Sequence, residues 1–233
     1  MKMRWHELLF MHWRVPVAAL RPHVPATLEI ETFDGSAWLG VVPFRMSGVR
    51  PRLVPPVPGL SAFPELNVRT YVVPKSTRDK PGVWFFSLDA TSRLAVRGAR
   101  WGFHLPYFDA HISCQVNGST NTPTVHYSSR RTHKGAPPAE LDMDYRPAGK
   151  AFQAEPGSLD YFLTERYCLY SAAKDGRMYR CEIAHAPWPL QPAKATTRRN
   201  SMTRQLGFDV PNGEALLHYA DYQEVVAWML HLV

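Results

Sequence analysis

One stretch of the chain alternates strictly between polar and apolar residues, and the expected function depends on which way its polar face points. Residues 65–72 alternate as a β-strand does, since successive side chains of a strand lie on opposite faces. At about 3.3 Å per residue, its acidic and basic ends lie too far apart to pair with each other. The pattern leaves two alternatives open: the polar face meets water, or it lines a ligand pocket inside a closed barrel. The polar face carries Glu65, Asn67, Arg69 and Tyr71, and the other carries Leu66, Val68, Thr70 and Val72.

Most of the remaining pattern is typical of short strands joined by tight turns. The apolar run at 5–14 predicts a first strand, and the run at 83–90 predicts an antiparallel neighbour of the alternating stretch. Residues 48–64 predict a loop that crosses the sheet. Further strands are expected at 28–33, 37–46, 110–116, 124–130, 142–146, 178–184, 216–219 and 225–230, with turns at Asp34-Gly35 and Asn117-Gly118.

Helical patterns are few and short. Residues 16–20 predict one or two turns, and residues 91–101 predict a helix that lies against the sheet with its arginines outward. The clearest helix begins after Ser158, which is a typical N-cap, and its apolar stripe continues to Tyr170. No repeat and no long linker divides the chain. We therefore expect a mainly β protein with a few short helices and a single domain over residues 1–233.

The composition limits the classes of partner and compartment. The net charge of +7 comes mainly from arginine, a side chain that suits carboxylate or phosphate ligands. The basic residues are scattered and are not interleaved with aromatic residues, so nucleic acid is not expected as a partner. Three cysteines without a CxxC spacing indicate reduced thiols. Since no stretch reads as a signal peptide or a membrane span, we expect a cytoplasmic protein without membrane contact, and a homo-oligomer is left open.

The familiar catalytic motifs are missing, and a smaller set of side chains is left to carry any chemistry. The sequence holds neither HExxH nor CxxC, no glycine-rich nucleotide loop and no GxSxG, so neither a metal nor an organic cofactor is expected. The alternative to a site is an ordinary buried ion pair that fixes the shape of the sheet. The side chains suited to proton transfer or anion binding are Glu65, Asn67, Arg69, Tyr71, Arg97, Arg100, His104, Tyr107, Arg166 and Tyr167.

Several segments together resemble the YqjF-like family of uncharacterised proteins. They are residues 10–16, 33–44, 63–71, 84–89, 162–167 and 187–191, so the resemblance extends over nearly the whole chain. The family has no established activity. It is similar, more remotely, to the acetoacetate decarboxylase superfamily, which implies a single-domain, antiparallel, cone-shaped β-barrel with an internal ligand cavity. That implied fold favours the pocket alternative, and by its place Glu65 resembles the superfamily's pocket glutamate.

The sequence departs from the decarboxylases at their catalytic lysine. In the superfamily this lysine forms a Schiff base, and it follows a proline shortly after a glycine- and arginine-containing pattern. The corresponding stretch here is 98–107, and the position after either candidate for the proline, His104 or Pro106, is Leu105 or Tyr107. The resemblance therefore does not imply Schiff-base decarboxylation.

These observations lead to one functional hypothesis and two alternatives. We expect a barrel that binds a small organic acid or carbonyl compound; a lyase, hydratase or isomerase step without a cofactor fits the residue types, and whether the protein is an enzyme is left open. The alternatives are a non-catalytic binding or sensing protein that uses the same pocket, and a scaffold whose barrel is filled by its own aromatic side chains. The expected proton carriers are Glu65 and His104, and the expected ligand-binding residues are Asn67, Arg69, Tyr71, Arg100 and Tyr107.

Overall fold

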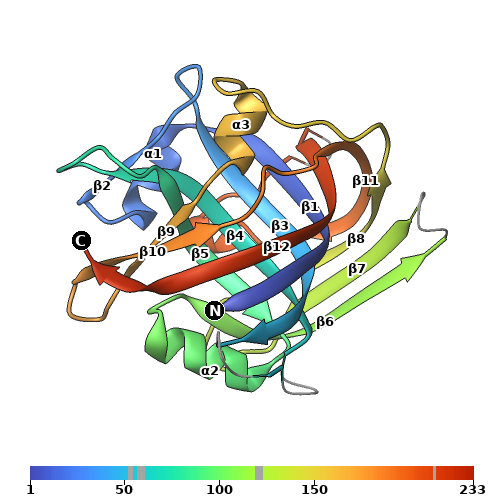
Figure 1. Ribbon diagram of the computed structural model, residues 1–233, viewed down its shortest axis with the longest axis horizontal. Helices are drawn as coiled ribbons and strands as arrows, with labels where there is room; N and C mark the ends of the chain where they lie inside the picture. Colours follow the sequence, from blue (N-terminus) through green and yellow to red (C-terminus); the bar gives the residue numbers. More distant parts are fainter. Residues whose placement is uncertain (52–54, 57–60, 119–122, 212–213) are drawn as a thin grey trace.

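A computed structural model describes residues 1–51, 55–56, 61–118, 123–211 and 214–233. Within these ranges, one twelve-stranded sheet accounts for most of the chain, with short helices at its ends (Figure 1). The helices are α1 (Val17–Leu20), α2 (Arg93–Gly102) and α3 (Leu159–Thr164), with single 3-10 turns η1 (Arg21–His23) and η2 (Arg204–Leu206). The strands are β1 (Lys2–Val15), β2 (Leu28–Ile30), β3 (Ala37–Arg50), β4 (Phe63–Pro74), β5 (Gly82–Ala90), β6 (Tyr107–Asn117), β7 (Thr124–Arg131), β8 (Glu140–Pro147), β9 (Cys168–Ala172), β10 (Met178–Ala184), β11 (Gln191–Asn200) and β12 (Leu216–Leu232).

The sheet closes on itself in two rings that share five strands. The smaller ring runs β12-β1-β3-β4-β5-β9-β10 and closes where β10 pairs with β12. The larger ring leaves β5 through β6, β7, β8 and β11 before it returns to β12. Figure 1 shows α2 at the lower end of the shared strands and α3 at the upper end. The predicted mainly β, barrel-type fold with few helices is confirmed.

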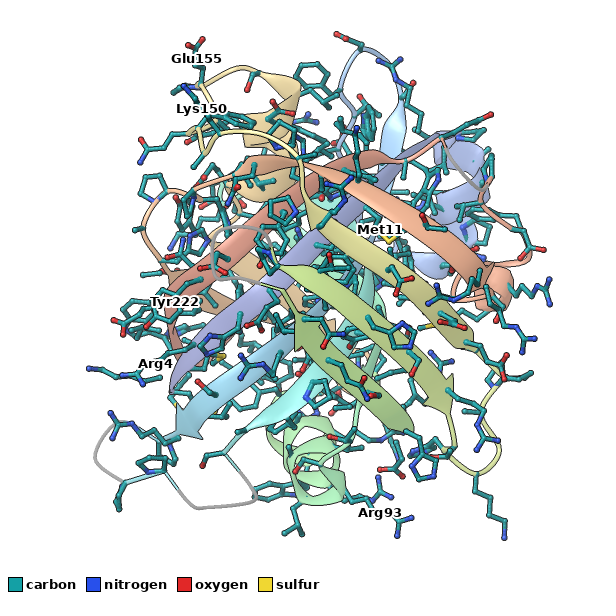
Figure 2. The ribbon with its side chains drawn as sticks, turned by 90° about the vertical axis from the view of Figure 1, so that its right-hand side faces the viewer. Arg4, Met11, Arg93, Lys150, Glu155 and Tyr222 are labelled. Carbon is teal, nitrogen blue, oxygen red and sulfur yellow. The ribbon has the colours of Figure 1, made fainter. Side chains whose placement is uncertain are left out.

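Strand β4 is buried on both faces along most of its length because it borders both rings. On β4, Leu66, Val68 and Val72 belong to a filled hydrophobic core inside the larger ring. Met11 of β1 lies in the same core and is labelled in Figure 2, which views the molecule from the side of β6, β7 and β8. The opposite face of β4 points into the smaller ring. Neither face of this strand is solvated.

β-bulges change the in-and-out alternation of three shared strands. On β1 the register against β3 gains one residue between His6 and Met11, and Glu7 has φ of 47°. An extra residue reverses the facing of all that follow, so both Trp5 and Leu8 point into the smaller ring. Gly48, with φ of 62°, accompanies a similar shift on β3, and β5 gains one residue opposite the Val68–Arg69 step of β4.

The predicted hairpin at Asp34-Gly35 forms only its turn. Both residues have positive φ, and Phe33 and Ser36 exchange backbone hydrogen bonds across them. The flanking strands do not pair with each other, because β3 already pairs with β1 on one edge and with β4 on the other. Strand β2 pairs with the far end of β4 instead.

Several further predictions are corrected by long-range pairing. The helix after Ser158 ends at Thr164, and the stripe expected to continue it becomes β9, which pairs with β5 and β10. The two closing strands are one long strand, β12, and β11 was not predicted. Pairing is not antiparallel throughout, since β5 runs parallel to β6 and β9. In the expected crossing loop, β3 continues to Arg50, and residues 52–54 and 57–60 lie outside the described ranges.

A buried ion pair links the two rings. The guanidinium of Arg131 on β7 donates to both carboxylate oxygens of Asp89 on β5, at 2.7–3.1 Å. The side chains are 1% and 0% exposed. Arg131 also donates to Gln205, whose amide donates to Ser87 of β5. The pair therefore holds the β6–β7–β8 segment of the larger ring against β5, a strand that also belongs to the smaller ring.

Asp89→Ala is expected to destabilise the protein by about 3–5 kcal/mol, because it leaves a buried guanidinium without a counter-ion. Urea unfolding followed by tryptophan fluorescence measures the change. Arg97→Ala, which breaks the Arg97–Asp109 pair in which the arginine is 55% exposed, is the control and is expected to cost less than about 1 kcal/mol. Similar costs for both variants would contradict the assigned role of Asp89.

Candidate functional site

The smaller ring encloses a cavity of about 490 Å³. This volume lies within the usual range of ligand pockets. The scaffold alternative, in which aromatic side chains fill the barrel, is therefore not what the structure has. All seven strands of the ring contribute to the lining, for example through Phe10 (β1), Val42 (β3), Asn67 (β4), Phe85 (β5), Leu169 (β9), Ile183 (β10) and Val225 (β12).

The polar face of β4 provides three of the polar groups in this largely apolar lining. Glu65, Asn67 and Arg69 all line the cavity. They reach it together because alternate residues of a strand share a face. The choice between a solvated face and a pocket is thus decided in favour of the pocket.

Glu65 is a buried carboxyl group held by one hydrogen bond. Glu65 is 4% exposed, and the hydroxyl of Tyr107 donates a hydrogen bond to its Oε2 at 2.7 Å. Burial in apolar surroundings raises its pKa to about 8; the Tyr107 hydrogen bond opposes this shift, and the nearby charge of Asp89 adds to it. At neutral pH this group is therefore mainly a neutral acid with a proton available on its free oxygen.

Tyr107 remains a hydrogen-bond donor over the same pH range. Burial raises its pKa well above the ordinary value, and the adjacent Glu65 raises it further. Its backbone is held by Arg100, whose guanidinium donates to the Tyr107 carbonyl at 2.6 Å. The pair of Glu65 and Tyr107 is thus preorganised, with the carboxyl as the group that can exchange a proton.

Arg69 carries a positive charge at the other end of this row. Among the described residues no carboxylate lies within ion-pairing distance of it; one terminal nitrogen donates to the Leu163 carbonyl at 3.4 Å, and its Nε has no protein partner. The guanidinium lies over the rings of Phe10 and Tyr71, at 5.4 and 5.8 Å. The Oδ1 of Asn67 likewise has no donor in the described part of the protein. Both atoms are thus buried without a hydrogen-bond partner among the described residues, in side chains that line the cavity.

Tyr71 is the next residue after Arg69 on this face of β4, but it does not line the cavity. Its hydroxyl donates to the Leu163 carbonyl at 2.8 Å, so it accepts from Nε2 of His12 at 2.6 Å. Burial, followed by the charge of Arg69, lowers the pKa of His12 well below its ordinary value, which keeps this imidazole neutral. Tyr71 therefore ties the end of α3 to the barrel wall, with both hydrogen-bonding capacities of its hydroxyl in use.

The structure places Arg100 and His104 outside the cavity lining. Arg100 is exposed on α2. His104 has φ of 52°, and its ring packs against Tyr179 at 5.1 Å. Neither side chain therefore belongs to the candidate site. Arg97, from the wider set, pairs with Asp109 at the surface.

Other lining residues were not singled out from the sequence. Trp5, Cys181, His185 and Trp188 line the cavity from β1, β10 and the segment that follows β10. Arg166, which was in the wider set, also lines it, but its charge is paired with Glu31. The sequence pattern does not predict that Trp5 lines the cavity, because simple alternation from Leu8 and Phe10 places Trp5 on the other face and the bulge at Glu7 reverses this. No lysine is among the described lining residues.

The described residues offer no cluster of three or more His, Cys, Asp or Glu side chains arranged to hold a metal ion. None of the described helices has the length and apolar content needed to span a bilayer.

Comparison with known proteins places this geometry in a family and a fold. The chain is 46% identical over 230 residues to the uncharacterized protein YqjF of Bacillus subtilis (strain 168), covering 99% of this chain and 91% of that protein. The enduracididine biosynthesis enzyme MppR complexed with pyruvate superposes with a TM-score of 0.65 at 12% identity, over 99% of this chain and 89% of that one. An acetoacetate decarboxylase-like enzyme from Sphingomonas wittichii RW1 gives a TM-score of 0.61 at 11% identity, over 100% and 92% of the two chains.

These structural likenesses show a shared fold. The family model DUF2071, described as an uncharacterized conserved protein, matches residues 2–224. The chain therefore belongs to the DUF2071 family of YqjF-like proteins and has the acetoacetate decarboxylase-like fold.

Proposed function

We propose that the smaller ring binds a small organic acid or carbonyl compound and that Glu65 acts on it as a proton donor and acceptor. The observation that carries this proposal is the neutral Glu65 carboxyl in an apolar cavity, held by the Tyr107 hydroxyl at 2.7 Å. A carboxyl whose pKa lies near the working pH can both give and take a proton. Burying such a group lowers stability, and a cost of this kind is typical of functional sites.

The proposed chemistry needs only side chains present in the cavity. The neutral Glu65 donates a hydrogen bond to a carbonyl oxygen of the ligand, and Tyr107 keeps the carboxyl oriented. Glu65 would give its proton to the carbonyl oxygen and, as the resulting carboxylate, take a proton from the adjacent carbon, which converts the carbonyl compound into its enol; this enol would support a lyase, hydratase or isomerase step. Without a lysine in the described lining, the proposal includes no Schiff base.

Arg69 is proposed as the counter-ion of the ligand. Arg69 is partly buried in a largely apolar cavity, where a guanidinium is stabilised when an anion pairs with it. Arg166 already has Glu31 for this purpose, whereas no described carboxylate pairs with Arg69. A carboxylate on the ligand would complete the site, and the Asn67 amide would orient it.

A second candidate function is a non-catalytic binding or sensing protein that uses the same cavity. The same contacts would then hold the ligand without turnover. MppR, whose structure contains pyruvate, supports a carbonyl acid as the ligand class for either function, without fixing the size of the acid. A thermal-shift screen with small carboxylates, keto acids and aldehydes identifies ligands, since a ligand of the native state raises the melting temperature. If the protein turns over a ligand found in the screen and the Glu65→Gln variant does not, the result supports an enzyme. Binding of the ligand without any turnover favours the second candidate function.

Glu65→Gln is expected to change how stability depends on pH. The folded-state pKa of about 8 lies above the ordinary value of 4.5. The stabilisation due to this proton is fully present below pH 4.5, declines as the pH rises, and is lost above pH 8. Between pH 5 and 8.5 the wild type should therefore lose more stability than the variant, by on the order of 3–5 kcal/mol.

Urea unfolding at several pH values measures this difference. Glu155→Gln is the matched control, because Glu155 is exposed at the surface, as Figure 2 shows. It should leave the pH profile of the wild type unchanged. Parallel profiles for Glu65→Gln and the wild type would show that Glu65 titrates normally and would refute its proposed role.

Arg69→Met is expected to weaken binding of carboxylate ligands at least tenfold, because it removes the charge while keeping most of the side-chain volume. Binding of the corresponding primary amides should change little. Isothermal titration calorimetry compares the two ligand types, and Arg130→Met, at an exposed position on β7, is the control variant. An unchanged carboxylate affinity in Arg69→Met would contradict the counter-ion role.

A further inference from the structure

The proton-transfer group and the anion-binding group proposed above, Glu65 and Arg69, lie at separate levels of the smaller ring. Glu65 and Arg69 are four residues apart on β4, about 13 Å along the strand. Their side chains also diverge: the Glu65 carboxyl contacts Tyr107, whereas the Arg69 guanidinium reaches the Leu163 carbonyl at the end of α3. A carbonyl acid of two or three carbons has its polar groups adjacent and cannot contact both.

The wall that joins these levels is apolar. Phe10 and Leu88 line it beside Asn67, and Phe44 faces Glu65 from the neighbouring strand β3. Toward α2 the lining continues with Trp5, Met46 and Phe63. This part of the cavity offers apolar contact and few hydrogen bonds, so it suits a hydrocarbon segment of the ligand.

Helix α2 closes this end with small residues. Ala95, Gly98, Ala99 and Gly102 line the cavity. A Cβ atom added at Gly98 or Gly102 would meet no heavy atom of the described residues within 4 Å. Glycine is unfavourable inside a helix, and here it leaves space that a larger side chain would fill. Gly98, Trp101 and Gly102 are exposed as well as lining, so the cavity meets solvent at this helix.

We propose that the natural ligand is an elongated organic acid with a medium-length apolar body, held with its carboxylate at Arg69 and its chain directed past Glu65 toward α2. Gly98 and Gly102 determine the length of chain that fits. This inference rests on the proposed function, because it uses Arg69 as the carboxylate site. It adds the size class of the ligand, its orientation and the element that selects its length.

Isothermal titration of straight-chain monocarboxylates from acetate to decanoate tests the inference. Each methylene that enters the apolar wall should tighten binding about fourfold, until the chain reaches α2. The double variant Gly98→Leu/Gly102→Leu should bind octanoate and decanoate at least tenfold more weakly and butanoate unchanged. Both substitutions favour the helix, and circular dichroism with a melting curve verifies folding.

Arg93→Leu is the matched control, since it adds a leucine to the same helix at an exposed position. Figure 2 shows Arg93 at the outer side of α2, and it does not line the cavity. This variant should show the wild-type dependence on chain length.

The outcomes separate the two proposals. Equal affinity for short and long acids, with binding still lost in Arg69→Met, would overturn the elongated ligand and leave the proposed function standing. Long-chain binding that is unaffected by the glycine substitutions would overturn the role of α2 and with it the assigned orientation. Binding of no carboxylate at any length would overturn both this inference and the anion site of the proposed function.

Discussion

The sharing of five strands between two rings is the constraint on which the rest of the structure depends. Where a strand borders two interiors, it cannot turn its polar groups to water, so each polar side chain there must be paired within the protein or be left for a ligand. On β4 the larger ring receives Leu66, Val68 and Val72, which complete its filled core. The smaller ring receives Glu65, Asn67 and Arg69 and keeps an open cavity. The topology of the sheet thus buries Glu65 and Asn67 and partly buries Arg69 in a largely apolar cavity.

This placement explains the chemistry of the site. Removal from water is what raises the pKa of Glu65 to about 8, since burial disfavours the charged form. Arg69 is partly buried in the same cavity, and no carboxylate of the described residues pairs with it. A fold optimised for stability alone would replace both groups with apolar residues. Two buried arginines are paired within the protein, in Arg131–Asp89 and Arg166–Glu31. Glu65 and Arg69 therefore mark the part of the interior whose residues favour function at the cost of stability.

Much of the fold could be predicted from local signals, and the errors arise where distant segments decide. Alternation identified β4 and its antiparallel neighbour β5, and the Ser158 cap correctly marks the start of α3. The same signals failed at residues 165–170, where an apolar stripe compatible with a helix is drawn into strand β9 by pairing with β5 and β10. The segment 191–200 is rich in polar residues and half-exposed along much of its length, so its strand character depends on pairing with β8.

The site could likewise be predicted in part. Glu65, Asn67 and Arg69 follow from the period of one strand, whereas a bulge at Glu7 and a proline-rich connector determine where Trp5 and Trp188 point. Arg100 and His104 were expected in the site because their side chains suit anion binding and proton transfer, but they lie on α2 and the turn after it and do not line the cavity.

The protonation of Glu65 is the central claim, and its direct titration is the most decisive measurement. Carbon-13 NMR of protein labelled at the glutamate side-chain carboxyl, assigned by comparison with Glu65→Gln, follows this group over the pH range in which the protein is folded. We expect a midpoint near pH 8, well separated from those of the surface glutamates. A midpoint near 4.5, the ordinary value, would mean that the carboxyl is ionised and solvated in the native protein, and would contradict both the burial of Glu65 and its role as a proton donor.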